Sequence, residues 1–282
     1  MVIVKKASDL SEFIDFQKKK GNIIGFVPTM GALHSGHLEL ISRSAQRSGL
    51  TVCSIFVNPT QFNDSRDYSQ YPKKIESDIK ILVSAGADLL FLPEPAEVYP
   101  KGTDNLELYD LGYLNTVLEG KYRPGHFQGV AQVMSRLLRL VNAHLVFMGQ
   151  KDYQQCMVVQ RLIDLLGIST RLVTCPTVRE GDGLAKSSRN LRLSLDQRAR
   201  APLIYQSMQE ISRRIHEDSP TLLKEETARK LTDAGFRVDY VEIATADTLQ
   251  PVEHWNSKTP LVILVAAFLG ETRLIDNMLL QL

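Results

Sequence analysis

Residues 23–37 read IIGFVPTMGALHSGH, and this stretch decides the fold of the first half of the chain. The apolar run at 23–27 is typical of a buried strand, while apolar spacing over 38–48 predicts a helix. A turn containing Gly31 joins the two and ends in a pair of histidines, His34 and His37. Strand, turn and helix in this order form the repeating unit of a parallel sheet.

The same alternation of apolar runs and amphipathic segments continues as far as Pro176. Strands are predicted at 23–27, 52–57, 89–92, 145–148 and 171–174. Helices are predicted between them, at 38–48, 75–85, 130–141 and 154–166. We therefore predict a doubly wound, Rossmann-like α/β domain over residues 1–176. Such a sheet binds ligands beyond the carboxyl ends of its strands.

A different pattern follows Pro176. Ser194 and Gln197 form a capping-box pattern that predicts a long helix over 196–216. A second helix, 221–234, is predicted to end at Gly235, and strands should follow at 238–243, 261–268 and 272–279. Helices followed by neighbouring strands favour a smaller α+β domain over residues 177–282.

Charge and hydropathy argue against several classes of protein. The 282 residues include 33 basic and 32 acidic ones, and a formal net charge of +1 gives no sign of nucleic-acid binding. The longest apolar run, 260–269, is too short to span a membrane, and the polar segment 8–20 argues against a leader peptide. We therefore expect a cytoplasmic protein without membrane or nucleic-acid partners.

The three cysteines have no spacing that indicates chemistry. Cys53, Cys156 and Cys175 lie far apart and fit neither a disulfide framework nor a metal-binding pair. We expect all three to be small buried apolar residues.

His34, Gly36 and His37 stand where the predicted strand gives way to a helix. A helix N-terminus offers unpaired N–H groups and a partial positive charge, which suit phosphate. Two histidines three apart share a face and donate hydrogen bonds to negative oxygens, while Gly36 lets the backbone come close. The alternative is two ordinary surface histidines at the start of a helix.

A second candidate site is the stretch 186–190, with the sequence KSSRN, in a loop that opens with Gly181 and Gly183. Two hydroxyls, an arginine and loop amides suit a triphosphate from which pyrophosphate departs. Alone, this string would be read as a solvated loop. Paired with the upstream histidine motif, it resembles the second signature of the nucleotidyl-transferase superfamily, which includes the class I aminoacyl-tRNA synthetases.

More specific strings lie between and beyond these two sites. They are SIFVNPTQF at 54–62, RPGHF at 123–127, GQKDYQQ at 149–155, LAKSSRN at 184–190 and LVAAFLG at 264–270. In this order, the strings resemble the pantothenate synthetase family over essentially the whole chain. The resemblance implies ATP-driven condensation of (R)-pantoate with β-alanine, through a pantoyl-adenylate, to give pantothenate, AMP and pyrophosphate. It also implies dependence on Mg²⁺ and a homodimer.

The resemblance also implies a set of site residues. Three are expected to be catalytic, namely His37 as a proton donor to the leaving group, His34, and Lys151 beside the α-phosphate. The substrates pantoate and β-alanine are expected at Gln61, Gln155, Asn58, Arg123 and His126, although a structural turn is an alternative for the last two. ATP is expected at Met30, Gly31, Ala32, Leu33, His34, Ser35, Gly36, His37, Gly149, Gln150, Lys151, Asp152, Val178, Lys186, Ser187, Ser188 and Arg189.

Three of these positions leave a choice open. Asp152 either holds the ribose or orients Lys151, and Asp78 is either an outer Mg²⁺ ligand or an ordinary helix-surface aspartate. Lys186 departs from the family, which usually has methionine or leucine near the adenine. A lysine there is expected to lay its stem along the base and point its ammonium outward.

The implied chemistry needs positioning more than base catalysis. A carboxylate is already ionised, so charge neutralisation and alignment should dominate its attack on the α-phosphorus. Neutral glutamine side chains orient a carboxylate without holding its charge as arginines would. The mixed anhydride must then be kept from water, and residues 123–126 and the C-terminal domain are the expected cover. The alternatives are a nucleotide-cofactor adenylyltransferase, a small tRNA synthetase and a non-catalytic nucleotide-binding module.

Overall fold

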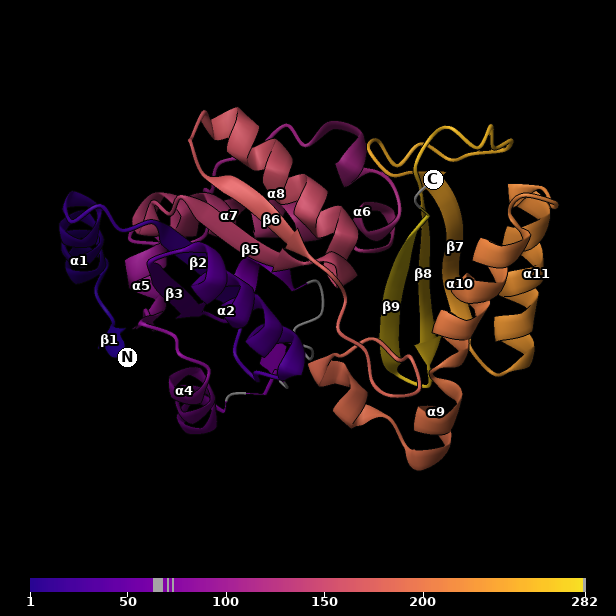
Figure 1. Cartoon of the computed structure of the whole chain (residues 1–282), viewed down its shortest axis with the longest axis horizontal. Helices are drawn as coiled ribbons and strands as arrows, with labels where there is room; N and C mark the ends of the chain where they lie inside the picture. The colour runs from indigo at the N-terminus through magenta and orange to yellow at the C-terminus, as the bar shows by residue number, and fades with distance from the viewer. Residues whose placement is uncertain (63–67, 70, 73, 281–282) are drawn as a thin grey trace. The chain divides into compact units, whose positions relative to one another are not determined.

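The structure is a computed structural model that describes residues 1–62, 68–69, 71–72 and 74–280. The chain divides into two compact units, Met1–Pro176 and Thr177–Leu282 (Figure 1). No helix within the described ranges is long and apolar enough to cross a membrane.

The N-terminal unit is built on a six-stranded sheet in the order β1-β4-β3-β2-β5-β6, and every recorded strand pair in it is parallel. The predicted doubly wound α/β fold is therefore confirmed. The strands are β1 (Val2–Val4), β2 (Ile24–Thr29), β3 (Leu50–Ile55), β4 (Leu89–Phe91), β5 (Leu145–Gly149) and β6 (Arg171–Cys175).

Helices cover both faces of this sheet (Figure 1). Residues alternate between the faces: Phe26 packs in the core under α1, α7 and α8, whereas Val27 packs in the core under α2 and α4. The α-helices are α1 (Ala7–Lys19), α2 (Ser35–Arg47), α4 (Ile75–Ser84), α5 (Pro95–Val98), α6 (Glu119–Tyr122), α7 (His126–Val141) and α8 (Tyr153–Leu166). Short 3₁₀ turns are η1 (Pro59–Gln61), η2 (Gly112–Asn115) and η3 (Gln150–Asp152).

The strand order identifies where this sheet can bind a ligand. From β2 the chain adds β3 and then β4 on one side, while β5 and β6 are added on the other. The order therefore reverses between β2 and β5, and such switch points bind ligands at the carboxyl ends of the strands. The loops that leave β2 and β5 carry His34 and Lys151, respectively.

Two N-terminal elements were not predicted from the sequence. Strand β1 has only three residues, two of them exposed, and helix α1 buries only Leu10 and Ile14. The periodic apolar signal is therefore weak in both. By contrast, the expectation for the cysteines is confirmed, since Cys53, Cys156 and Cys175 are free and buried.

The C-terminal unit packs helices on a three-stranded antiparallel sheet in the order β7-β8-β9. It is the smaller α+β unit that the sequence predicted. The strands are β7 (Arg237–Thr245), β8 (Leu261–Leu269) and β9 (Thr272–Leu280), and the helices are η4 (Ser188–Arg192), α9 (Leu195–Arg200), α10 (Leu203–Arg214) and α11 (Pro220–Asp233).

The prediction of a single long helix over 196–216 is wrong. The capping box of Ser194 and Gln197 does open a helix, but α9 ends at Arg200 and α10 begins after Pro202. A proline has no N–H for the helical hydrogen-bond ladder, so Pro202 interrupts that ladder between the two helices.

Candidate active site

The loop between β2 and α2 is held by a buried carboxylate. The N–H of Ala32 donates to Oδ2 of Asp78 at 2.8 Å, and the N–H of Leu33 donates to Oδ1 at 2.9 Å. The loop needs this support because Ala32, a non-glycine residue, has a positive φ of 51°. Asp78 is 1% exposed, so its interpretation as a surface aspartate is wrong.

His34 and His37 cap the N-terminus of α2 and contact each other. The N–H of Gly36 donates to Nδ1 of His34 at 3.1 Å, and the N–H of His34 donates to Nδ1 of His37 at 3.2 Å. The two ring centroids are 4.1 Å apart. Because each Nδ1 accepts a hydrogen bond, each neutral ring carries its proton on Nε2. The pair therefore presents Nε2–H donors, which suit an anion.

Burial keeps His37 neutral. It lowers the pKa of His37 from 6.5 to about 3, with further lowering from the neighbouring His34 ring and from the positive charge of Lys151. The loops after β2 and β5 thus bring a histidine pair and a lysine into one electrostatic environment. Both histidines are half-buried, which disfavours the alternative of two ordinary surface histidines.

Gln61 lies in η1, directly after β3, and its amide orientation is fixed by its neighbours. Its Oε1 accepts a hydrogen bond from Nδ2 of Asn58 at 3.1 Å, and its Nε2 donates to Sδ of Met30 at 3.0 Å. With the oxygen occupied by a donor, Gln61 offers its remaining N–H to a ligand. That is the orientation that a carboxylate requires.

Asn58 supports Gln61 and is not itself exposed to a ligand. It is 1% exposed, and its Nδ2 donates to the carbonyl of Gly129 at 3.1 Å as well as to Gln61. Its Oδ1 accepts from the hydroxyls of Tyr99 at 2.7 Å and Thr60 at 3.2 Å. All the hydrogen-bonding capacity of this amide is therefore used within the protein, which disfavours the predicted substrate contact.

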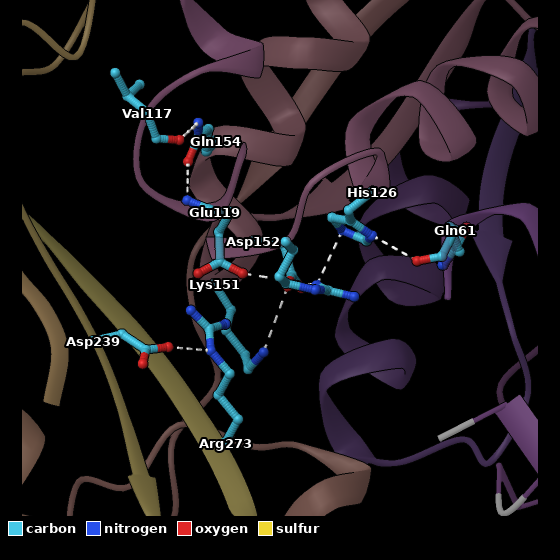
Figure 2. A network of polar contacts seen from close by, with 10 residues as sticks. Gln61, Val117, Glu119, His126, Lys151, Asp152, Gln154, Asp239 and Arg273 are labelled. Atoms are coloured by element: carbon cyan, nitrogen blue, oxygen red, sulfur yellow. Dashed lines mark hydrogen bonds and ion pairs between the residues drawn. The ribbon is translucent and has the colours of Figure 1, made fainter. Parts of the chain in front are cut away.

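His126 joins Gln61 to Arg123. Its Nδ1 lies 2.9 Å from the main-chain carbonyl of Gln61, and its Nε2 lies 3.0 Å from Nη1 of Arg123 (Figure 2 shows the link to Gln61). Since a guanidinium only donates, Nε2 must accept and Nδ1 must carry the proton. Arg123 also forms an ion pair with Glu119 at 3.7 Å.

The segment that follows β5 carries Lys151, Gln154 and Gln155. Lys151 lies 3.6 Å from the carboxylate of Asp152, an arrangement that supports an orienting role for this aspartate. Gln154 is buried and holds the segment 114–119, because its amide bonds to Glu119 and Val117 (Figure 2) and to the carbonyl of Leu114. Gln155 is half-buried and forms no hydrogen bond within the described ranges, so its amide is available to a ligand.

In the C-terminal unit, a short antiparallel turn leads into the stretch 186–190, the second candidate site. The N–H of Lys186 donates to the carbonyl of Val178 at 2.9 Å, which closes the turn. The ammonium of Lys186 pairs with Glu180. The hydroxyl of Ser187 caps η4 by accepting from the N–H of Arg189 at 3.2 Å. The backbone before Ser188 is therefore ordered, and Lys186 has its own counter-charge.

Arg179 fixes that turn to the body of the C-terminal unit. Its guanidinium pairs with the buried carboxylate of Asp276 and also donates to the carbonyl of Gly183 at 3.1 Å. The ring of Tyr205 lies 3.9 Å from the guanidinium carbon. Gly183 has a backbone φ of 95°, which residues with a side chain rarely adopt.

No group of three histidine, cysteine, aspartate or glutamate side chains is arranged to hold a metal ion among the residues that the structure describes. Both oxygens of Asp78 already accept backbone hydrogen bonds. A cation that takes most of its ligands from phosphate and water fits this arrangement better than a protein cage.

Comparison with known proteins agrees with these observations. A family model described as pantoate-beta-alanine ligase matches residues 2–279. The chain belongs to the pantoate-β-alanine ligase family. It is 45% identical over 285 residues to the pantothenate synthetase of Pseudomonas fluorescens, covering 100% of this chain and 99% of that protein. It is 40% identical to that of Cytophaga hutchinsonii, with 100% of both covered.

Solved structures of the pantoate-β-alanine ligase family have the same fold. The pantothenate synthetase of Thermus thermophilus matches with a TM-score of 0.89 and 40% identity, covering 99% of each chain. The pantoate-β-alanine ligase of Francisella tularensis, solved in complex with β-γ ATP and β-alanine, matches with a TM-score of 0.83 and 34% identity, covering 99% and 97% of the two chains. The chain is therefore an ATP-using ligase of pantothenate biosynthesis.

Sequence reasoning for this ligase singled out the histidine pair, Lys151 and Gln61, whose roles stay predictions. The contacts described above link the loops that carry them. It missed the supporting residues, namely Asp78 in this role, Gln154, Arg179 and Asp276. No spacing could have found them, because each contacts a segment distant in sequence. The one signal available for Asp78 was an aspartate on the apolar face of an amphipathic helix.

Proposed function

We propose that the carboxyl edge of the N-terminal sheet binds ATP and pantoate and activates the pantoate carboxylate. In the first step a carboxylate oxygen attacks the α-phosphorus, the bond to the β-phosphate oxygen breaks, and pyrophosphate leaves. In the second step the neutral amine of β-alanine attacks the acyl carbon, AMP leaves with the former carboxylate oxygen, and the nitrogen loses a proton. The fixed donors of the loop after β2 are the observation that carries this proposal.

His34 and His37 bind phosphate as neutral Nε2–H donors. Neutral donors bind the phosphate by hydrogen bonds and add no fixed charge that would hinder the later release of pyrophosphate. Lys151 supplies the permanent positive charge. An approaching phosphate would raise the lowered pKa of His37, and this would favour protonation as charge builds on the leaving group. Met30, Gly31, Ala32, Leu33, Ser35, Gly36, Gly149, Gln150 and Asp152 form the remaining ATP contacts of this unit.

The C-terminal unit contributes to ATP binding through the ordered turn. Val178 and the backbone of Lys186 contact the nucleoside, and Ser187, Ser188 and Arg189 contact the phosphates. A capped 3₁₀ turn keeps these donors fixed before the ligand arrives, so less entropy is lost on binding. The ion pair with Glu180 limits how much of the Lys186 charge acts on the nucleotide.

Gln61 and Gln155 bind pantoate. The oriented N–H of Gln61 meets a carboxylate or hydroxyl oxygen, and the unengaged amide of Gln155 meets a second group. Neutral donors orient the attacking oxygen without reducing its nucleophilicity. Asn58 keeps Gln61 in place. Arg123 binds the carboxylate of β-alanine, for which a guanidinium has the matching geometry.

Magnesium accompanies the triphosphate, where it neutralises phosphate charge. We assign it no direct contact with Asp78, whose role is to hold the loop in front of His34. The enzyme acts as a cytoplasmic homodimer, as the resemblance to its family implies.

One experiment separates this function from its alternatives. Pyrophosphate release from ATP is measured with pantoate, with β-alanine, with both and with neither. We expect sustained release only when both are present. Release with a nucleotide precursor instead of pantoate would indicate a cofactor adenylyltransferase, release with an amino acid and tRNA would indicate a synthetase, and ATP binding without release would indicate a non-catalytic module.

A further inference from the structure

His126 is a buried histidine that the proposed chemistry does not use directly. It is 5% exposed, and each of its ring nitrogens has a protein partner. A ligand could reach either nitrogen only by displacing Arg123 or the main chain of Gln61. Its expected direct contact with a substrate therefore has no support in the geometry.

We propose that His126 is a positioning residue that links the pantoate site to the β-alanine site through its two ring nitrogens. Nδ1–H holds the main chain of Gln61, and Nε2 holds the guanidinium of Arg123. This inference rests on the proposed roles of Gln61 and Arg123. It adds that a single neutral imidazole sets the separation and orientation of both groups.

The packing around His126 supports a fixed link. A Cβ atom added to Gly129 would lie 2.2 Å from the carbonyl oxygen of Thr60, so the first turn of α7 lies directly against η1. A shift of Gln61 would therefore move the helix that carries His126. On the far side, Glu119 holds Arg123 by an ion pair, and Gln154 fixes the backbone of Glu119.

The ionisation state of His126 agrees with this role. Burial, followed by the positive charge of Arg123, lowers its pKa from 6.5 to about 4. The ring is therefore neutral near pH 7, and one nitrogen is left as an acceptor for the guanidinium. An imidazolium would place a second cation against Arg123 and lose that hydrogen bond.

Two conservative substitutions preserve one half of the link each. In asparagine the amide nitrogen is as many bonds from Cβ as Nδ1 is in histidine, so His126→Asn keeps a donor for Gln61. In glutamine the terminal amide atoms match Nε2, so His126→Gln keeps an acceptor for Arg123. His144→Asn is the matched control, because His144 is an exposed histidine that precedes β5, at the opposite end of that strand from Lys151.

The KM values for pantoate and β-alanine are measured separately for the three variants and the parent. His126→Asn should raise the KM for β-alanine about tenfold and leave that for pantoate within about twofold, and His126→Gln should do the reverse. His144→Asn should change neither. Equal effects of both His126 variants on both substrates, or no effect, would overturn the inference.

A failure of the proposed function would look different, because the parent itself would then show no pyrophosphate release dependent on pantoate and β-alanine.

If the His126 variants do not fold, ¹⁵N NMR of the parent still tests the link. We expect a protonated Nδ1 and an unprotonated Nε2 for His126 near neutral pH. The opposite tautomer, which predominates in free histidine, would contradict the proposal.

Discussion

The backbone N–H of His34 donates a hydrogen bond to Nδ1 of His37 at 3.2 Å, so the first histidine of the motif fixes the ring of the second. Together with the bond from Gly36 to His34, this closes a capping box in which both partners are imidazoles. The same contact that begins α2 also sets which nitrogen of His37 faces a ligand. Helix capping and the proposed phosphate binding thus depend on the same two side chains.

His37→Ala and Lys151→Ala should each slow formation of the adenylate about 100-fold or more, because each removes a group that stabilises charge in the transition state. Single-turnover pyrophosphate release measures this step. Thermal unfolding serves as the control and should change little for Lys151→Ala. Nearly normal turnover in either variant would contradict the role assigned to that residue.

Gln61→Ala and Gln155→Ala should weaken the use of pantoate about tenfold to a hundredfold, the usual cost of losing a hydrogen bond to a charged group. ATP affinity, measured by calorimetry, should remain near the parent value. Gln61→Glu should be worse than alanine, because it places a carboxylate against that of the substrate. Normal binding of pantoate by Gln61→Glu would mean that the acid site lies elsewhere.

Asp78→Ala should raise the KM for ATP and lower stability by about 1–3 kcal/mol, because it leaves the N–H groups of Ala32 and Leu33 without their buried acceptor. Asp78→Asn retains one acceptor but brings an NH₂ group against the other N–H. It should therefore be only partly better than alanine. Chemical denaturation and ATP titration measure the two effects. An Asp78→Ala enzyme with unchanged ATP use would show that the loop does not need this support.

Lys186 and Glu180 should behave as a coupled pair. Lys186→Met alone removes the ion-pair partner of Glu180 beside the proposed ATP-binding turn and should raise the KM for ATP about twofold to fivefold. The double variant Lys186→Met, Glu180→Gln should restore most of the loss. The effect is small because both side chains are partly exposed, and it should shrink as salt rises. Strict additivity of the two substitutions would mean that the pair does not act on ATP.

Acid should destabilise the protein partly through His37. Its folded-state pKa of about 3 lies below the ordinary 6.5, so the unfolded chain binds more protons between these values. Stability should therefore fall as pH falls from 6.5 towards 3. His37→Gln lacks this titrating imidazole. As pH falls, the denaturation midpoint of His37→Gln should therefore rise relative to that of the parent. A difference between the two midpoints that stays constant with pH would contradict the lowered pKa.

The sequence predicted the parallel sheet well because β2, β3 and β5 are buried on both faces and appear as continuous apolar runs. It predicted the histidine pair because strand, turn and helix N-terminus are adjacent in the chain. It could not predict Asp78 holding Ala32, nor Asn58 bound to the carbonyl of Gly129, because these contacts join residues that only the tertiary fold brings together. The break at Pro202 was readable in principle, but the apolar spacing of α10 masked it.

The central claim is that the acid is activated before the amine enters. Positional isotope exchange in ATP, run with pantoate and without β-alanine, tests it most directly. We predict exchange of the labelled oxygen between bridging and non-bridging positions, because enzyme-bound pantoyl-adenylate and pyrophosphate form reversibly from pantoate and ATP alone. Exchange that strictly required β-alanine would contradict the stepwise mechanism and the role assigned to the edge of the sheet.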